Sequence, residues 1–132
     1  GEGGAVLNIS SIAATHPKPT QRSYDGAVYG MTKAAIERFT TGLASEMYDS
    51  GISVNSLSPD SFIATPGQMF GRKYSQELID AAEPVEDIAE AALTLINGNP
   101  AEETGGIYFT SEVMKKYDLT GTDIGMDAPV PN

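Results

Sequence analysis

Cysteine is absent from the 132 residues of this chain, and so is any long hydrophobic run. Without cysteine the chain forms neither a disulfide framework nor a thiolate metal site. No apolar run approaches the roughly 20 residues that a membrane-spanning helix needs. Residues 1–4 also lack the basic region and the apolar stretch of a signal peptide. We therefore expect no membrane association and a cytoplasmic location.

Basic residues are scarce as well. The chain has 8 Lys and Arg against 18 Asp and Glu, which gives a net charge of −10 and a pI of about 4.3. Such a surface repels phosphate backbones, so we expect no nucleic-acid partner. The acidic residues show no spacing typical of a metal site, and we assign them to solubility. A hydrophobic fraction of 40% indicates a globular chain, long enough for one domain with its own core.

The apolar pattern predicts three strands. Residues 5–10 are a short, nearly continuous apolar run bounded by glycine and serine, and residues 52–57 and 105–110 read as a second and a third strand. The first run is apolar on both faces, which favours a strand buried in a parallel sheet. Nothing in the chain precedes that strand to cover its free edge, and an exposed edge is a liability. We take this as the first indication that an upstream segment is missing.

Two long helices are predicted between the strands. From about residue 27 to residue 49, apolar residues recur every four positions, and Gly51 suits the left-handed position after a helix. The repeating positions are Ala35, Phe39, Leu43 and Met47. Pro84 suits the first turn of a second helix, which Gly98 ends. Residues 60–83 are expected to be irregular, with a short helix near 74–82.

The order strand, helix, strand, helix, strand predicts one fold class. Such alternation implies right-handed crossovers and a parallel, three-layer α/β arrangement. Functional groups of open α/β sheets gather beyond the carboxyl ends of the strands. Ser11 and the turn that begins at Pro59 both lie at such ends.

Tyr29 and Lys33 carry the strongest chemical signal. They are four positions apart at the start of the first long helix, so they share one face. A phenol is a poor acid or base at neutral pH, but an ammonium group a few ångströms away favours the phenolate. The pair is a plausible proton donor and acceptor for a carbonyl or alcohol, and Ser11 could hold the same oxygen. Tyr24 is the weaker alternative, because Val28 and not lysine follows it four positions later.

Six stretches, in this order, resemble the short-chain dehydrogenase/reductase family. They cover about residues 4 to 110 and read GAVLNISS at 4–11, YGMTKAAIE at 29–37, GISVNSLSP at 51–59, FIATP at 62–66, PVEDIAEAAL at 84–93 and TGGIY at 104–108. The resemblance implies a partial Rossmann fold in which residues 1–132 form the C-terminal part of a single domain. It also implies an assembly of identical subunits, with the first long helix packed between them.

The resemblance also implies a role for each matching residue. Tyr29 would be the general acid/base, Lys33 would tune Tyr29 and bind the nicotinamide ribose, and Ser11 would orient the substrate carbonyl. The cofactor, NAD or NADP, would lie against the turn that starts at Pro59, where Ile63 and Thr65 would hold the carboxamide and a nearby phosphate. The reaction would be hydride transfer between this cofactor and a small carbonyl or alcohol substrate.

The sequence departs from the family in three ways. The glycine-rich N-terminal half is absent, so we expect the chain to be inactive alone. Tyr29 follows Ser11 by 18 positions, a longer interval than is usual, and Pro59-Asp60 replaces a Pro-Gly turn with one extra residue before Ile63. Two alternatives stay open: a nucleotide-sugar epimerase or dehydratase of the same superfamily, which Glu37 would suit, and a non-catalytic binding module.

Overall fold

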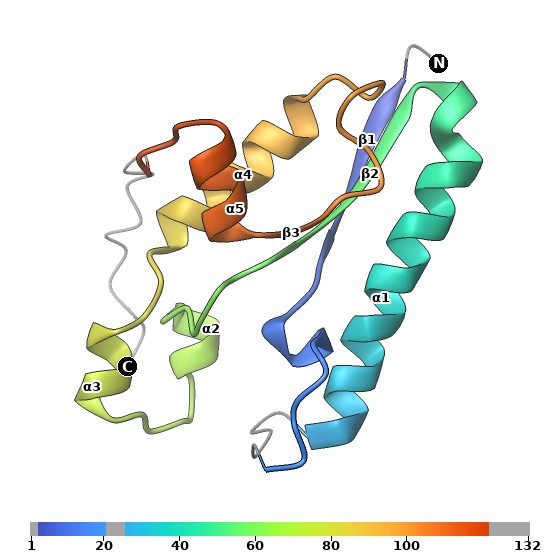
Figure 1. Cartoon of the computed structure of the whole chain (residues 1–132). Coiled ribbons are helices and arrows are strands. Elements are labelled where there is room, and N and C mark those ends of the chain that lie inside the picture. The colour runs from blue at the N-terminus through green and yellow to red at the C-terminus, as the bar shows by residue number, and fades with distance from the viewer. Residues whose placement is uncertain (1–2, 21–25, 122–132) are drawn as a thin grey trace.

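The structure, a computed structural model, describes residues 3–20 and 26–121. Three parallel strands form a sheet in the order β1-β2-β3, with helices on both faces (Figure 1). The elements are β1 (Gly4–Ile9), the 3-10 helix η1 (Ile12–Ala14), α1 (Gly26–Met47), the 3-10 helix η2 (Tyr48–Ser50), β2 (Ile52–Ser58), α2 (Pro66–Met69), α3 (Gln76–Asp80), α4 (Val85–Asn97), β3 (Ile107–Phe109) and α5 (Thr110–Lys116). The predicted parallel, three-layer α/β arrangement is confirmed.

Strand β2 forms the centre of the sheet. It pairs with β1 through the whole length of β1, and with β3 through its last three residues, 56–58. Residues 53–58 of β2 are all buried, as expected for a strand with a neighbour on each side and a helix on each face. Gly51 enters the strand from η2 in the left-handed conformation, with a φ of 65°. This confirms the predicted function of Gly51 as the residue that ends the helical segment.

Successive side chains of a strand point to opposite faces of the sheet, and different helices cover the two faces. The side chains of Asn8 and Ser10 point to α1, where they donate hydrogen bonds to Thr40 and Glu37. Leu57 belongs to the other face and packs with residues of α4 and α5 in the main core. That core consists of Leu57, Ala91, Leu95 and Val113. The α1 layer therefore includes polar contacts to the sheet, whereas the α4 and α5 layer packs around an apolar core.

The expectation of right-handed crossovers throughout is wrong for one of the two connections. Each step from β1 to β2 to β3 moves the same way across the sheet, yet α1 and α4 cover opposite faces (Figure 1). Two crossovers of the same hand would place both helices on one face. The right-handed preference describes a twisted strand that feeds one helix packed on the sheet. The second connection, residues 59–106, contains three helices.

Strand β1 is not buried on both faces as predicted. Val6 is 37% exposed and Ile9 is 49% exposed, and within the described residues β1 has only β2 as a partner. The free edge noted in the sequence is thus an edge strand with apolar side chains at the surface. An edge of this kind offers unpaired backbone groups to another strand.

The buried stripe of α1 also differs from the predicted one. Thr40 and Ala44 are its buried residues, whereas Phe39 of the predicted stripe is 58% exposed. Small side chains face the sheet because helix and sheet approach closely there. The exposed stripe is left without a partner in the described part of the chain.

Other boundaries differ by a few residues. Strand β3 begins at Ile107 and not at Gly105, although Gly105 and Gly106 already bond to the backbone of β2. Helix α4 begins at Val85, one residue after Pro84. Helices α2 and α5 were not predicted, and α3 is shorter than expected. No helix in the described part of the chain is both long and apolar enough to cross a lipid bilayer.

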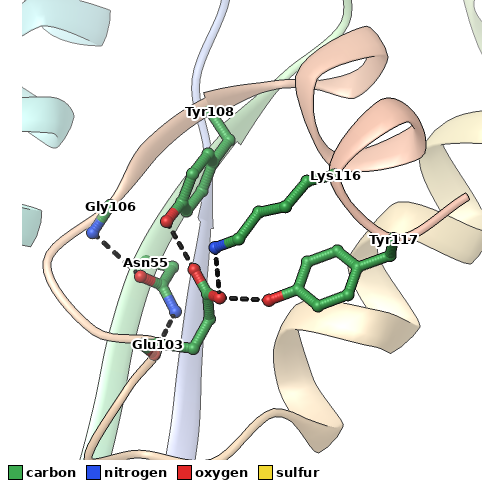
Figure 2. Close-up of polar contacts among 6 residues, drawn as sticks. All are labelled: Asn55, Glu103, Gly106, Tyr108, Lys116 and Tyr117. Atoms are coloured by element: carbon green, nitrogen blue, oxygen red, sulfur yellow. Dashed lines mark hydrogen bonds and ion pairs between the residues drawn. The ribbon is translucent and has the colours of Figure 1, made fainter.

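A buried carboxylate fixes helix α5 to the loop before β3. Glu103 is 5% exposed and accepts hydrogen bonds from Tyr108, Tyr117 and Lys116, the last at 2.6 Å between Nζ and Oε2 (Figure 2). Asn55 of β2 completes the group by donating to the Glu103 carbonyl at 2.9 Å. Burial alone raises the pKa of the Glu103 carboxyl, but the three donors outweigh burial and hold the pKa below its usual range.

The donors respond in the opposite direction. The hydrogen bond to Glu103 raises the pKa of Lys116. Burial and the same carboxylate raise the pKa of Tyr108, and the hydrogen bond to Glu103 raises that of Tyr117. Each shift favours the charged carboxylate with a protonated donor. The cluster is therefore a stabilising contact over a middle range of pH.

Candidate active site

A cavity of about 700 Å³ lies beyond the carboxyl ends of β1 and β2. Its walls come from the end of β1, the first turns of α1 and the segment between β2 and α2. This edge of an open parallel sheet is where functional groups gather. Six residues were assigned to catalysis or cofactor binding from the sequence, and all six line this cavity: Ser11, Tyr29, Lys33, Pro59, Ile63 and Thr65.

Lys33 is anchored at the floor of the cavity. Its Nζ donates a hydrogen bond of 2.9 Å to the carbonyl of Ile9, the last residue of β1. The same atom lies 5.6 Å from the centre of the Tyr29 ring, within the range of a cation–π contact. An ammonium group has three N–H donors, so two stay available after the bond to Ile9. The helical spacing thus places the amine beside the phenol and keeps it there.

The two serines after β1 have different surroundings. Ser10 is 3% exposed, and its hydroxyl donates to Glu37 of α1 at 2.7 Å. Ser11 is partly exposed in the cavity, and its Oγ accepts a 3.2 Å hydrogen bond from the amide of Ala13. The Ser11 hydroxyl keeps its own proton for donation. Of the pair, Ser11 is the one whose hydroxyl can meet a ligand.

Gly30 allows the 3-10 helix η1 to approach α1 closely. A Cβ at this position would lie 2.7 Å from the carbonyl oxygen of Ala13, which is shorter than a van der Waals contact. Gly30 follows Tyr29 directly, and Ala13 belongs to the 3-10 turn that Ser11 caps. The missing side chain therefore sets how near the Ser11 hydroxyl comes to the Tyr29 helix.

Gly30→Ala should consequently disturb the cavity. The clash is with backbone, so the turn must move, and we expect the free energy of unfolding to fall by about 1–3 kcal/mol. We expect any turnover that depends on Ser11 and Tyr29 to fall as well. Gly42→Ala on the same helix is the control, because its Cβ meets only the flexible end of Arg38. Urea unfolding of both variants checks the prediction, and equal stability of the two would contradict it.

The segment after β2 supplies the opposite wall. The carbonyl of Ile63 accepts from the amide of Thr65 at 2.9 Å, and the Ile63 amide donates to no other described group. Thr65 caps α2, with its Oγ1 accepting from the amide of Gln68 at 3.3 Å. A threonine followed directly by Pro66 is an N-cap signal, and it could have predicted α2 from the sequence.

Asp60 occupies the position of the glycine in the expected Pro-Gly turn, and its side chain has hydrogen-bond partners outside the cavity. Its carboxylate accepts hydrogen bonds from the amide and the hydroxyl of Ser111, both at 2.7 Å. Glu83 holds the same turn through the amides of Asp60 and Ser61. No local sequence pattern links position 83 or 111 to position 60, so neither contact was predictable from the sequence.

The structure gives two other sequence candidates no place in this cavity. His16 lines a separate apolar cavity of about 510 Å³ between η1 and the start of α1. Tyr24, the alternative phenol, lies outside the described residues. Within residues 3–20 and 26–121, no three His, Asp or Glu side chains gather in a way that could hold a metal ion.

Comparisons with known proteins agree on one family. The family model described as enoyl-(acyl carrier protein) reductase matches residues 1–109. An uncharacterized oxidoreductase of Escherichia coli K12 is 32% identical over 113 residues, which are 80% of this chain and 43% of that protein. Short-chain reductase protein NovJ of Streptomyces niveus is 30% identical over 129 residues, or 97% of this chain and 45% of that protein.

A similar solved structure extends the comparison to the fold. L-sorbose reductase from Gluconobacter frateurii, in complex with NADPH and L-sorbose, matches 82% of this chain at a TM-score of 0.63 and 26% identity. The match covers 46% of the reductase chain, and it confirms the predicted partial Rossmann fold. The chain spans less than half the length of each of these three relatives.

Proposed function

The chain belongs to the short-chain dehydrogenase/reductase family, and we propose that it carries the catalytic half of an oxidoreductase. The reaction is hydride transfer between NAD(H) or NADP(H) and a small carbonyl or alcohol substrate. One observation carries the proposal: Ser11, Tyr29 and Lys33 line one cavity, and Lys33 is fixed there by its bond to Ile9. The NADPH complex of the sorbose reductase supports a nicotinamide cofactor.

Each side chain then has one task. The Tyr29 hydroxyl gives a proton to the substrate oxygen in reduction and takes it back in oxidation. Ser11 donates a hydrogen bond to the same oxygen and orients it. The ammonium group of Lys33 lies beside the phenol, and its positive charge favours the phenolate that Tyr29 forms when it gives up its proton. Since Lys33 cannot swing away without losing its bond to Ile9, the relay is preorganised.

The donors and acceptors of the cavity fit a nicotinamide cofactor. Two N–H groups of Lys33 and the amide of Ile63 donate to none of the described residues. The Lys33 groups suit the hydroxyls of a ribose, and the Ile63 amide suits a carboxamide oxygen. The Thr65 hydroxyl suits a phosphate oxygen, and Pro59 adds an apolar surface. When bound, the nicotinamide supplies or accepts the hydride. The chain's own residues hold it and move the proton.

An upstream half completes the proposed enzyme, and we refer to the two halves together as the complete protein. The open edge of β1, with Val6 and Ile9 exposed, suits a further parallel strand. The partial coverage of the relatives supports the same view. The α1 surface with the exposed Phe39 and the half-buried Leu43 suits packing against a second copy, so we also propose a homo-oligomer.

The described geometry gives the epimerase alternative no added support. Glu37, which suited that branch, accepts a hydrogen bond from Ser10 and connects α1 to β1. The non-catalytic binding module stays the second candidate, and the binding measurements below separate it from the oxidoreductase.

Binding measurements on two lengths of chain test the proposal. We expect the isolated chain to bind NAD(H) and NADP(H) very weakly and to self-associate through the β1 edge. Calorimetry and light scattering on this chain measure both properties. Micromolar binding to a monomeric isolated chain would contradict the need for an upstream half. A panel of carbonyl substrates with NADH or NADPH then tests the complete protein, and no turnover and no cofactor binding there would refute the oxidoreductase.

A further inference from the structure

We propose that Glu83 and Asp60 are positioning residues for the active-site cavity. They hold the turn of residues 59–62, here called the β2 turn, which forms the cavity wall before Ile63. The proposal rests on the proposed function, because the wall matters only if a cofactor lies against it. Neither carboxylate is placed among the reacting groups, and both act through the backbone of the turn.

Glu83 holds the β2 turn from the connection between α3 and α4. Its Oε2 accepts a hydrogen bond from the Asp60 amide at 2.7 Å and from the Ser61 amide at 3.3 Å. Its own amide donates to the Phe62 carbonyl at 2.8 Å. One residue therefore bonds to three consecutive residues of the turn. Hydrogen bonds to a charged acceptor are roughly twice as strong as neutral ones, so this is the main polar anchor of the turn.

Asp60 connects the turn to a second rigid element. Both of its carboxylate oxygens accept from Ser111, one from the amide and one from the hydroxyl, each at 2.7 Å. Ser111 lies in the first turn of α5, and Val113 of that helix is fully buried in the main core. The turn is thus tied to an element whose position the core already fixes.

Packing alone does not hold the β2 turn in place. Asp60 and Ser61 line the active-site cavity on one side and a second cavity of about 280 Å³ on the other. Glu83 and Ser111 belong to the lining of this second cavity. Asp60 and Ser61 are exposed, and residues with open space on both sides have few van der Waals neighbours to fix them. Phe62 of the same turn packs against the ring of Tyr74, but the positions of Asp60 and Ser61 depend on the polar anchors from Glu83 and Ser111.

The position of the turn sets the position of Ile63. Ile63 follows Phe62 directly, and its free amide is the group assigned to the nicotinamide carboxamide. A displacement of about 1 Å in a positioning group can change reactivity by orders of magnitude. Loss of an anchor should therefore weaken cofactor binding even where the fold survives.

The test uses two measurements on the complete protein. Hydrogen exchange reports protection of the Asp60 and Ser61 amides, and calorimetry reports the Kd for NADH and NADPH. The variants are Glu83→Ala, Glu83→Gln and Ser111→Ala. Glu77→Ala is the matched control, because Glu77 is an exposed glutamate of α3 outside both cavities.

We expect Glu83→Ala to expose the Asp60 and Ser61 amides, because both lose their acceptor. We expect it to weaken cofactor binding about tenfold, the factor that corresponds to one displaced hydrogen bond, here that of the Ile63 amide. Glu83→Gln keeps an acceptor oxygen and should stay within about threefold of wild type. Ser111→Ala removes one of the two bonds to Asp60 and should fall between them. Glu77→Ala should match wild type in both measurements.

The outcomes separate the two proposals. Unchanged exchange in Glu83→Ala would show that Glu83 does not hold the turn, and it would overturn the inference. If Glu83→Ala exposes the amides but leaves the Kd unchanged, the contacts are structural only, and the inference is overturned. The same holds if a lower melting temperature is the only effect. If Glu83→Ala does not fold, Glu83→Gln and Ser111→Ala decide by the same criteria. Wild-type protein that binds neither cofactor would instead refute the proposed function, and this positioning role with it.

Discussion

Replacing Tyr29 by phenylalanine is expected to lower turnover of the complete protein by about 10²- to 10⁴-fold, the usual contribution of a general acid/base. Phenylalanine keeps the ring above which Lys33 lies, so the cation–π contact survives. The Tyr29 hydroxyl donates to no described residue, and the side chain is 43% exposed. We therefore expect the free energy of unfolding to change by less than about 0.5 kcal/mol.

Tyr48→Phe is the control for this variant. Tyr48 lies just after the other end of α1, 56% exposed, and does not line the active-site cavity. Steady-state rates with NADH or NADPH and a responsive carbonyl should fall for the first variant and stay at wild-type level for the second. Near-wild-type rates in Tyr29→Phe would reject the proton-relay role.

Replacing Glu103 by glutamine is expected to lower the free energy of unfolding. The substitution weakens three hydrogen bonds to a charged acceptor and leaves Lys116 without its counter-ion. Breaking a fully buried ion pair costs about 3–5 kcal/mol. The Lys116 side chain is 46% exposed, so water recovers part of this loss. We expect a decrease of about 2 kcal/mol in the free energy of unfolding at pH 7.

The effect should depend on pH in a defined window. The pKa of Glu103 is lowered in the fold, so its contribution is complete above the unfolded value near 4.5 and disappears as the pH falls through the folded pKa. The pKa values of Tyr108, Tyr117 and Lys116 are raised, so their contribution is complete below about pH 10 and disappears as the pH rises through the folded values. Wild type and Glu103→Gln should therefore differ most between about pH 5 and pH 10.

Urea unfolding at pH 3, 7 and 9, at one protein concentration, checks this prediction. Glu102→Gln is the matched control, because it removes the same charge from the neighbouring, exposed residue. The difference between wild type and Glu103→Gln should shrink at pH 3, while Glu102→Gln stays close to wild type throughout. An equal effect of the two substitutions at pH 7 would mean that the Glu103 cluster contributes little.

Local sequence patterns predicted the framework of the fold well. Strand β2 lies between Gly51 and Pro59, which bounded it in the sequence, and the long period-four segment became α1. These features depend on neighbours within one turn or one strand, which the sequence displays directly. The candidate site also came from sequence, since the ordered motifs placed Ser11, Tyr29 and Lys33 at positions that the fold brings to one cavity.

Features that depend on distant contacts were not predictable in this way. Periodicity marked Phe39 as inward-facing on α1, but the close approach of the sheet favours Thr40 and Ala44 on the buried side. The anchoring of Asp60 by Glu83, and the cluster around Glu103, join residues that no local pattern connects. The hand of the second crossover likewise depends on which face of the sheet α4 covers, and no local pattern determines that face.

Asn55 gives the chain a late step in folding. Its amide group donates to the Glu103 carbonyl and accepts from the Gly106 amide, so it joins β2 to residues 48 and 51 positions further along (Figure 2). Contacts across such intervals form only after a long loop has closed, and proteins dominated by them fold slowly. We therefore expect β2 to gain these contacts only after residues 103–106 have come back to the sheet. Until then the half-polar strand β2 lies uncovered along one edge, open to pairing with another molecule during synthesis.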